Sequence, residues 1–330
     1  MNCFHCHKLS LHKQADCQFK ILFIIKKNSK MKKNKYIFLF ASVLASQFFV
    51  SCNEDSIDKV NAPIAYEAIG GYESSEDIAA ANLVTKFSFE NSIADSKSGI
   101  TGGVGTNVTY GKGIKGMAYK GSSSSFIAYS AVASSLVDVK SITVSMWINT
   151  NPHTGGAQSL FMLPKTTDFW GNIFSLVEGT GPATTMLVKN HVQKDVMPSI
   201  AWSGQFIEHA GTNVLTNMFG KWTHVVWTYS GASSTYSMYI DGKKLDLPAS
   251  IAKRYASDPL AGGVGYGDLA NSNVSKFIIG GFQQHLGAPW GAPDGWMLNY
   301  TGMMDEFRIY NAALSDNEVV ALYKLEKDNR

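Results

Sequence analysis

Short runs of β-branched and aromatic residues, separated by turn-forming residues, recur along most of the chain. In the strongest example, residues 222–229 are nearly all β-branched or aromatic, residues 230–234 are small or polar, and residues 236–240 alternate in polarity. This pattern favours strands with one buried face over helices. Asp241-Gly242 comes next, and glycine accepts the positive φ that a two-residue hairpin turn requires. The segment therefore predicts an antiparallel meander.

Similar runs follow one another at intervals of roughly ten residues, which is typical of a β-sandwich and not of β-α-β units. They lie at residues 83–89, 126–129, 141–149, 160–163, 173–177, 186–189, 199–202, 276–281 and 300–310. The chain ends differently, because Ser315 and Glu318 have the spacing of a helix capping box. We therefore expect many short strands followed by one short helix that ends near residue 325.

Three stretches resemble one known family. They are Trp222-Thr-His-Val-Val-Trp-Thr-Tyr with the later Tyr239-Ile-Asp-Gly-Lys, then Ser141-Ile-Thr-Val-Ser-Met-Trp, and Gly302-Met-Met-Asp-Glu-Phe-Arg-Ile-Tyr-Asn. All are similar to stretches of the laminin-G-like jelly rolls of the concanavalin A type. The resemblance implies an all-β fold, an antiparallel jelly-roll β-sandwich with a short C-terminal helix, over residues 82–325. It implies less about function, because this fold hosts lectins, adhesion modules, glycosidases and lyases.

An export signal precedes this domain at residues 31–51. Three lysines at positions 32, 33 and 35 are followed by an apolar run at residues 36–50, which is short for a membrane span and typical of a signal peptide. Phe-Phe-Val-Ser-Cys, ending at Cys52, resembles a bacterial lipobox and implies that Cys52 is lipidated. Simple secretion is the alternative.

Residues 1–30 do not fit an export signal, and we interpret them as an upstream extension with Met31 as the true start. Cys3, Cys6, His7 and Cys17 in this extension have the residue types of a zinc site, but no second pair of ligands follows. The remaining cysteine is Cys52, so we expect an exported body without disulfides.

Residues 52–81 are interpreted as the lipidated cysteine and a flexible tether, and residues 326–330 as a tail. The acidic run at 53–56 resembles the surface-export signal of lipoproteins in glycan-degrading Gram-negative bacteria, although a solvated tether is the simpler interpretation. The resemblance implies a protein anchored by lipid in the outer membrane and exposed at the cell surface.

The net charge of +3 comes from the N-terminal segment, because the first 52 residues contain nine lysines and one acid. The rest of the chain has 20 basic and 25 acidic residues. This balance argues against nucleic acid as a partner.

Asp305 is the most informative carboxylate. Strict strand alternation places it on one face with Met303, Phe307 and Ile309, and a buried carboxylate needs a partner. The family resemblance implies a structural Ca²⁺ that joins Asp305 to Asp95 in the opening loop, with further oxygen ligands. The alternative is that Asp305 accepts backbone N–H bonds or pairs with a lysine.

Carbohydrate binding needs exposed aromatic faces with polar groups beside them. Trp290 and Trp296 are the first candidates, because they occupy a loop rich in glycine and proline. The remaining candidates are two tryptophans, Trp170 and Trp202, and two polar partners, Asp294 and Gln283.

Catalytic residues are harder to find. The glycosidases of this fold use a Glu-x-Asp-x-x-Glu strand, which this sequence lacks, and Asp305 and Glu306 are adjacent on a strand. We therefore predict a non-catalytic, carbohydrate-binding surface lipoprotein that serves polysaccharide capture or utilisation, with other glycan-uptake proteins as partners. The alternatives are a divergent glycoside hydrolase or polysaccharide lyase, and a protein-binding adhesion module.

Overall fold

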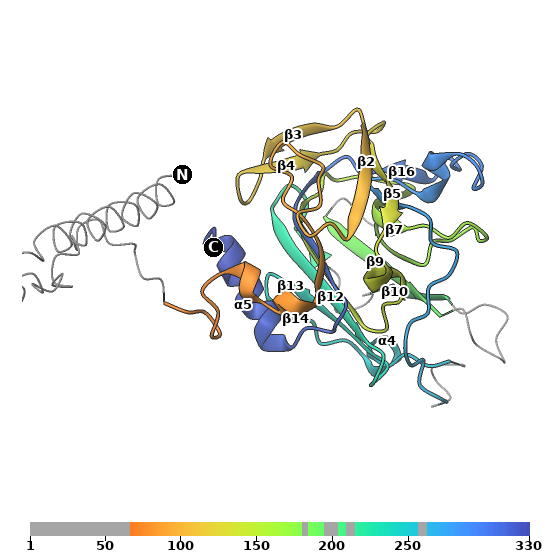
Figure 1. Ribbon diagram of the computed structural model, residues 1–330. Helices are drawn as coiled ribbons and strands as arrows, with labels where there is room; N and C mark the ends of the chain where they lie inside the picture. Colours follow the sequence, from red (N-terminus) through yellow and green to blue (C-terminus); the bar gives the residue numbers. More distant parts are fainter. Residues whose placement is uncertain (1–66, 180–183, 195–203, 209–214, 257–262) are drawn as a thin grey trace, which may run out of the picture. The chain divides into compact units, whose positions relative to one another are not determined.

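Two β-sheets face each other across one hydrophobic core in the computed structural model (Figure 1), which describes residues 67–179, 184–194, 204–208, 215–256 and 263–330. The predicted antiparallel jelly-roll sandwich is confirmed, and one strand pair, β16 with β7, is parallel. The predicted signal peptide, Cys52, the cysteine–histidine cluster and the predicted strand at 199–202 lie outside the described residues.

The described part of the first sheet has eight strands. In spatial order they are β14 (Lys243–Lys244), β13 (Thr235–Ile240), β12 (Thr223–Ser230), β6 (Ile142–Asn149), β17 (Met303–Tyr310), β4 (Met117–Lys120) and β3 (Thr109–Lys112), with β1 (Leu83–Phe87) paired to β17. The predicted meander is β12, β13 and β14, in which Asp241 and Gly242 both have positive φ.

The described part of the second sheet has nine strands. In spatial order they are β10 (Gly204–Glu208), β9 (Thr185–Gln193), β8 (Ile173–Glu178), β7 (Ala157–Leu163), β15 (Phe277–Ile279), β5 (Phe126–Val132) and β2 (Ile100–Thr106), with β11 (Leu215–Thr216) on β9 and β16 (Met297–Asn299) on β7. The helices are α3 (Ser134–Val137), α4 (Ala249–Ala252) and α5 (Asp316–Lys327), with 3₁₀ turns η2 (Ser75–Asp77), η3 (Ala80–Asn82) and η6 (Gln283–Leu286). None of these described helices has the length and apolar character that a membrane crossing requires.

The core lies between the sheets and follows the alternation seen in the sequence. In β6, the four apolar residues at 142, 144, 146 and 148 belong to the central cluster. Rings from both sheets meet there, with Phe307 of β17 at 5.1 Å from Phe161 of β7 and 6.2 Å from Phe277 of β15, measured between ring centroids. Alternation with period two therefore determines which face of each strand is buried.

Strict alternation fails in β17, which corrects the predicted face of Asp305. Met304, Phe307 and Ile309 enter the core, whereas Met303 does not. The pairing with β6 shifts between Asp305 and Arg308, and Glu306 has a φ of 44°. A bulge of this kind inserts one residue and changes which side chains share a face.

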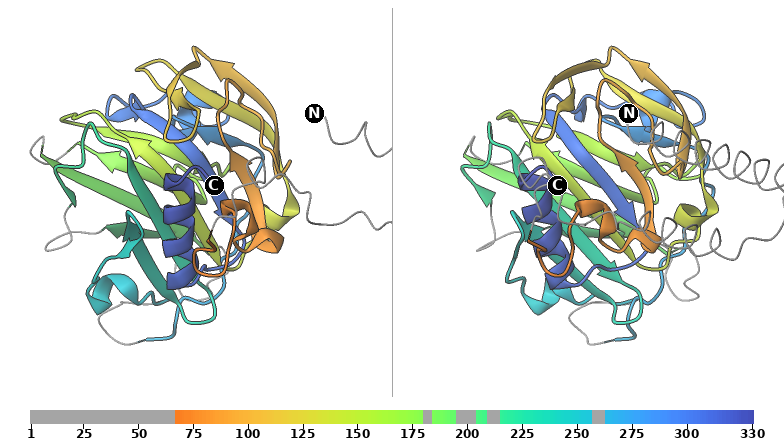
Figure 2. Two further views of the ribbon diagram at one scale, coloured as in Figure 1. Left: turned by 90° about the vertical axis from the view of Figure 1, so that its left-hand side faces the viewer. Right: turned by 60° about the vertical axis from the view of Figure 1, so that its left-hand side comes forward.

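Helix α5 covers the outer face of the eight-stranded sheet, beside the segment that contains η2 (Figure 2). Its N-terminus has the predicted capping box, since Ser315 and Glu318 bond to each other's backbone N–H groups. Val319, Leu322 and Leu325 are buried against the sheet. The predicted C-terminal helix is therefore present and extends two residues beyond residue 325.

A buried ionic cluster joins α5 to the sheet. Arg308 of β17 bonds to Glu326 of α5 at 2.7 Å, to Glu306 at 2.8 Å and to Glu76 at 3.0 Å, and Lys86 pairs with Glu306 at 3.1 Å. Burial, together with the neighbouring Glu306, raises the pKa of Glu326 to about 7 despite its bond to Arg308. The cluster has three carboxylates and two cations, so one carboxylate in it is easily protonated.

Candidate functional site

Three aromatic side chains gather on the outer side of the nine-stranded sheet, and we call them the aromatic patch: Phe169, Trp170 and Trp296. The ring centroids of Phe169 and Trp170 are 5.0 Å apart, those of Trp170 and Trp296 are 5.7 Å apart, and those of Phe169 and Trp296 are 6.5 Å apart. Phe169 is 48% exposed and Trp296 is 36% exposed. The patch therefore presents aromatic surface to solvent.

Buried rings support the patch from below. Trp170 stacks on Phe174 at 5.8 Å, and Phe174 stacks on His191 at 4.5 Å with nearly parallel planes. Phe282 contacts Trp296 edge to face at 5.5 Å. These supports come from β8, β9 and the segment after β15, so the patch rests on the sheet itself and is held in place before any ligand arrives.

Gln283 fixes the loop that carries Phe169. Its Oε1 accepts a bond from the backbone N–H of Lys165 at 3.0 Å, and its Nε2 donates to the carbonyls of Asp168 at 2.8 Å and Phe169 at 3.0 Å. Gln284 donates to the same Phe169 carbonyl at 2.8 Å. Gln283 is fully buried, and through these bonds it positions the loop that carries Phe169.

The structure brings two of the predicted sugar contacts together, Trp170 and Trp296. Trp290 is half-buried; its indole N–H donates to the Lys165 carbonyl at 2.7 Å, and the Lys276 ammonium lies 6.0 Å from its ring centroid. Asp294 is exposed in the same loop. Trp202 lies outside the described residues, and the roles of all these residues as sugar contacts stay predictions.

Sequence reasoning missed Phe169. The signal was available, because Phe169 directly precedes a tryptophan in a polar loop, where a large apolar side chain has few ways to be buried.

The two carboxylates of the predicted calcium site are surrounded by hydrogen-bond donors. Asp95 accepts from the backbone N–H groups of residues 86, 97 and 100 at 2.8–2.9 Å and from the Thr85 hydroxyl. Asp305 accepts from the N–H groups of residues 114, 115 and 306 at 2.8–3.1 Å.

These donors point at the lone pairs that a cation would need, so the two side chains as placed do not fit a calcium site. No group of three or more His, Cys, Asp or Glu side chains suited to a metal occurs in the described residues. The arrangement matches the alternative hypothesis of backbone hydrogen bonding to Asp305. Calcium binding stays a prediction, which a comparison of thermal unfolding in calcium and in EDTA would test.

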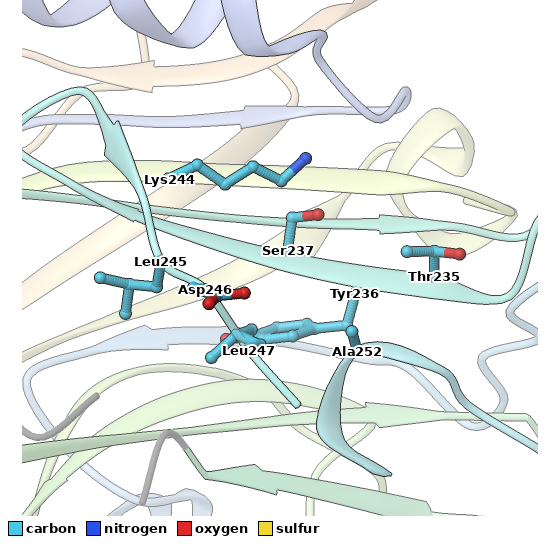
Figure 3. Close-up of a pocket in the computed structure, with 8 residues that line it drawn as sticks. All are labelled: Thr235, Tyr236, Ser237, Lys244, Leu245, Asp246, Leu247 and Ala252. Carbon is cyan, nitrogen blue, oxygen red and sulfur yellow. The ribbon is translucent and has the colours of Figure 1, made fainter. Parts of the chain in front are cut away.

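Two pockets accompany these features. One, of about 390 Å³, lies at the β13–β14 edge near α4 (Figure 3) and is lined by Thr235, Tyr236, Ser237, Lys244, Leu245, Asp246, Leu247 and Ala252. The other, of about 240 Å³, lies next to the aromatic patch and is lined by Ser123, Gln158, His285, Met297, Leu298, Asn299 and Thr301. Among these described lining residues, the first pocket has one carboxylate and the second has none.

The two facing antiparallel sheets have the fold of a lectin- or glucanase-like β-sandwich. Residues 124–277 match the laminin-G-type model of the concanavalin A-like lectin/glucanases superfamily, which confirms the resemblance found in the sequence. No curated protein matches the chain.

Two solved structures illustrate the likeness. One is domain 4 of AbnA, a GH43 extracellular arabinanase from Geobacillus stearothermophilus, in complex with arabinotriose. Its identity to this chain is 18%, the match covers 73% of this chain and 98% of that one, and the TM-score is 0.48. The other is botulinum neurotoxin type C, whose cell entry is described as dependent upon interaction with two ganglioside molecules. Its identity to this chain is 13%, the match covers 74% of this chain and 52% of the neurotoxin chain, and the TM-score is 0.51. The match spans about half of the neurotoxin chain, and at such identities it shows the fold alone.

Proposed function

We propose that this protein binds carbohydrate without cleaving it and captures polysaccharide at the cell surface. The observation that carries the proposal is the aromatic patch, in which Phe169 and Trp296 expose ring surface and both pack against Trp170. The apolar C–H faces of a sugar ring pack against aromatic faces, while its hydroxyls remain hydrogen-bonded to water or to polar side chains. A patch of this kind suits a sugar better than a charged or fully apolar ligand.

The surroundings of the patch favour binding over hydrolysis. Glycosidases use two carboxylates that flank the scissile bond, about 5–9 Å apart. Near the patch, Asp168 is paired with Lys165 at 3.7 Å, Asp294 is exposed two residues before Trp296, and the adjacent pocket has no carboxylate among its described lining residues. The alternatives, a hydrolase or lyase and a protein-binding adhesion module, are outcomes of the experiment below.

The cellular setting is proposed from the sequence. Lipidation at Cys52 would anchor the protein in the outer membrane, and the acidic segment behind it would direct the protein to the surface. There it would hold glycan chains near other glycan-uptake proteins. Nucleic acid is not a proposed partner.

The test is an affinity-gel screen of a recombinant protein beginning at residue 61 against a panel of polysaccharides, with the chain length of each polysaccharide measured in parallel. We expect slowed migration on at least one polysaccharide and no change in its chain length. Shortened or unsaturated products would show an enzyme instead. Unchanged migration on every gel would favour the adhesion module.

A further inference from the structure

The 240 Å³ pocket lies beside the aromatic patch, because its lining begins with the residue after Trp296. Trp296 is followed at once by β16, and all three residues of β16 line the pocket. A series of ring contacts makes the same connection, since Phe282 is 5.5 Å from Trp296 and 6.3 Å from His285, a residue of the pocket. One ligand chain can therefore contact both features.

Gln158 gives the pocket a hydrogen-bond donor. Its side chain is 2% exposed, and its Oε1 accepts from the Thr301 N–H at 2.9 Å and from the Thr301 hydroxyl at 3.2 Å. Its Nε2 has no acceptor among the described residues, and Gln158 is one of the residues that line the pocket. An amide whose oxygen is fixed and whose N–H₂ group has no protein acceptor can donate to a ligand hydroxyl.

His285 and Asn299 complete the polar lining. Nδ1 of His285 lies 3.0 Å from the backbone nitrogen of Phe282 and 3.3 Å from the Phe282 carbonyl oxygen, so its own segment engages Nδ1 and Nε2 is the ring nitrogen left for a ligand. Burial lowers the pKa of His285, so the ring is neutral near pH 7. Asn299 donates through Nδ2 to the Gly280 carbonyl at 3.1 Å, which leaves its Oδ1 as an acceptor.

We propose that this pocket binds one uncharged sugar residue through neighbouring hydroxyl groups, and that pocket and patch together select neutral glycan chains. Each hydroxyl of a sugar can donate and accept, so adjacent hydroxyls match the amide donor of Gln158, the Nε2 atom of His285 and the acceptor of Asn299. The proposal rests on the proposed function and adds a second subsite and a ligand class to it.

Charge and size support this ligand class. None of the described lining residues carries a charge at neutral pH, so a uronate or sulfate group would lose water without gaining a cation. The volume of about 240 Å³ is below the ~300–1,000 Å³ of pockets that enclose drug-sized ligands, which fits one sugar residue of a longer chain.

The test compares binding of neutral polymers (arabinan, xylan, mannan and β-glucan) with anionic ones (polygalacturonate and chondroitin sulfate) in affinity gels. Ser123→Phe fills the mouth of the pocket from an exposed position, and Gln158→Met removes the amide. Ser233→Phe, at an exposed position of the β12–β13 loop, is the matched control. We expect at least one neutral polymer to bind, and its affinity to fall at least fivefold in Ser123→Phe and Gln158→Met but not in the control.

The outcomes separate the two proposals. If a polymer binds and Trp296→Ala weakens it while both pocket variants bind like the wild type, the pocket proposal fails and the proposed function stands. Stronger binding of the anionic polymers overturns the neutral ligand class. If no polymer binds, the proposed function and the pocket fail together. Ser123→Phe keeps the test decisive if Gln158→Met does not fold.

Discussion

Single side chains determine the geometry of the aromatic patch. The rings alone would not order two loops, because each loop must lose conformational entropy to hold them. Gln283 connects the segment after β15 to the loop between β7 and β8 through three backbone bonds, and the Trp290 indole adds a fourth to the same loop. Buried hydrogen bonds therefore hold the patch in place, in addition to the contacts between its rings.

Gln283→Leu should destabilise the protein and weaken glycan binding. The substitution leaves the Lys165 N–H and the Asp168 carbonyl without their partner, while the Phe169 carbonyl keeps its bond from Gln284. An unsatisfied buried group costs about 1–3 kcal/mol. Urea unfolding measures the loss, and Thr167→Val in the same loop is the control, expected within about 0.5 kcal/mol of the wild type. Equal stability of the two variants would show that Gln283 does not order the loop.

Glu326→Gln should alter how stability depends on pH. The pKa of Glu326 is raised from 4.5 to about 7, so the folded state favours the protonated acid and loses this stability as pH rises through that interval. Glutamine imitates the protonated acid. The free energy of unfolding of the variant, minus that of the wild type, should therefore increase between about pH 4.5 and 7 and then level off.

Urea unfolding of both proteins between pH 4 and 8 (roughly one series per half unit) checks this difference directly. The difference removes the opposing contribution of His191, whose pKa burial lowers to about 3. A difference that does not change with pH would contradict a raised pKa for Glu326.

At the scale of elements, helix α5 closes one outer face of the sandwich. It buries the Trp147 indole, which donates to Glu326 at 2.8 Å, and it completes the partners of Arg308. Polar groups of β6 and β17 would otherwise face water or remain unpaired. The helix thus holds the eight-stranded sheet, while the aromatic patch lies on the other sheet.

Leu322→Ala should cost about 2–5 kcal/mol, as large-to-small substitutions at fully buried leucines do. Urea unfolding gives the value, with Lys324→Ala on the exposed side of α5 as the control. Because the patch lies on the other sheet, the folded Leu322→Ala protein should bind glycan like the wild type. A loss of stability below about 0.5 kcal/mol would show that α5 contributes little to the fold.

Local patterns predicted most elements and few of the long-range contacts. The strand at 141–149, the hairpin at Asp241-Gly242 and the capped helix were predictable because alternation, turn residues and caps act over a few positions. The bulge in β17 was not, because it depends on N–H groups of residues 114 and 115 reaching Asp305. The glycine-rich strand β2 gave no apolar pattern to detect.

In the candidate site, too, local features were predictable and long-range contacts were not. Exposed tryptophans in loops were identified from composition, whereas the pocket depends on the parallel pairing of β16 with β7, which brings Leu298 beside Gln158. No local signal predicts a pairing between segments so far apart in the sequence.

At the scale of the whole molecule, the domain is proposed to work at the end of a lipid anchor. Cys52→Ser should therefore move the protein from the membrane fraction to the soluble fraction of cells that process bacterial lipoproteins, because the lipid chains supply the membrane affinity. Fractionation followed by immunoblotting measures the change. Retention of the variant in the membrane fraction would contradict lipidation at Cys52.

The central claim is that the aromatic patch holds the glycan, and one comparison tests it most directly. The affinity of Trp296→Ala for a polysaccharide that the wild type binds is measured in gels beside Val264→Ala, which alters an apolar side chain that is 79% exposed elsewhere. We expect Trp296→Ala to bind at least about tenfold more weakly, a loss of about 1.4 kcal/mol, and Val264→Ala to bind like the wild type. Undiminished binding by folded Trp296→Ala would contradict the claim.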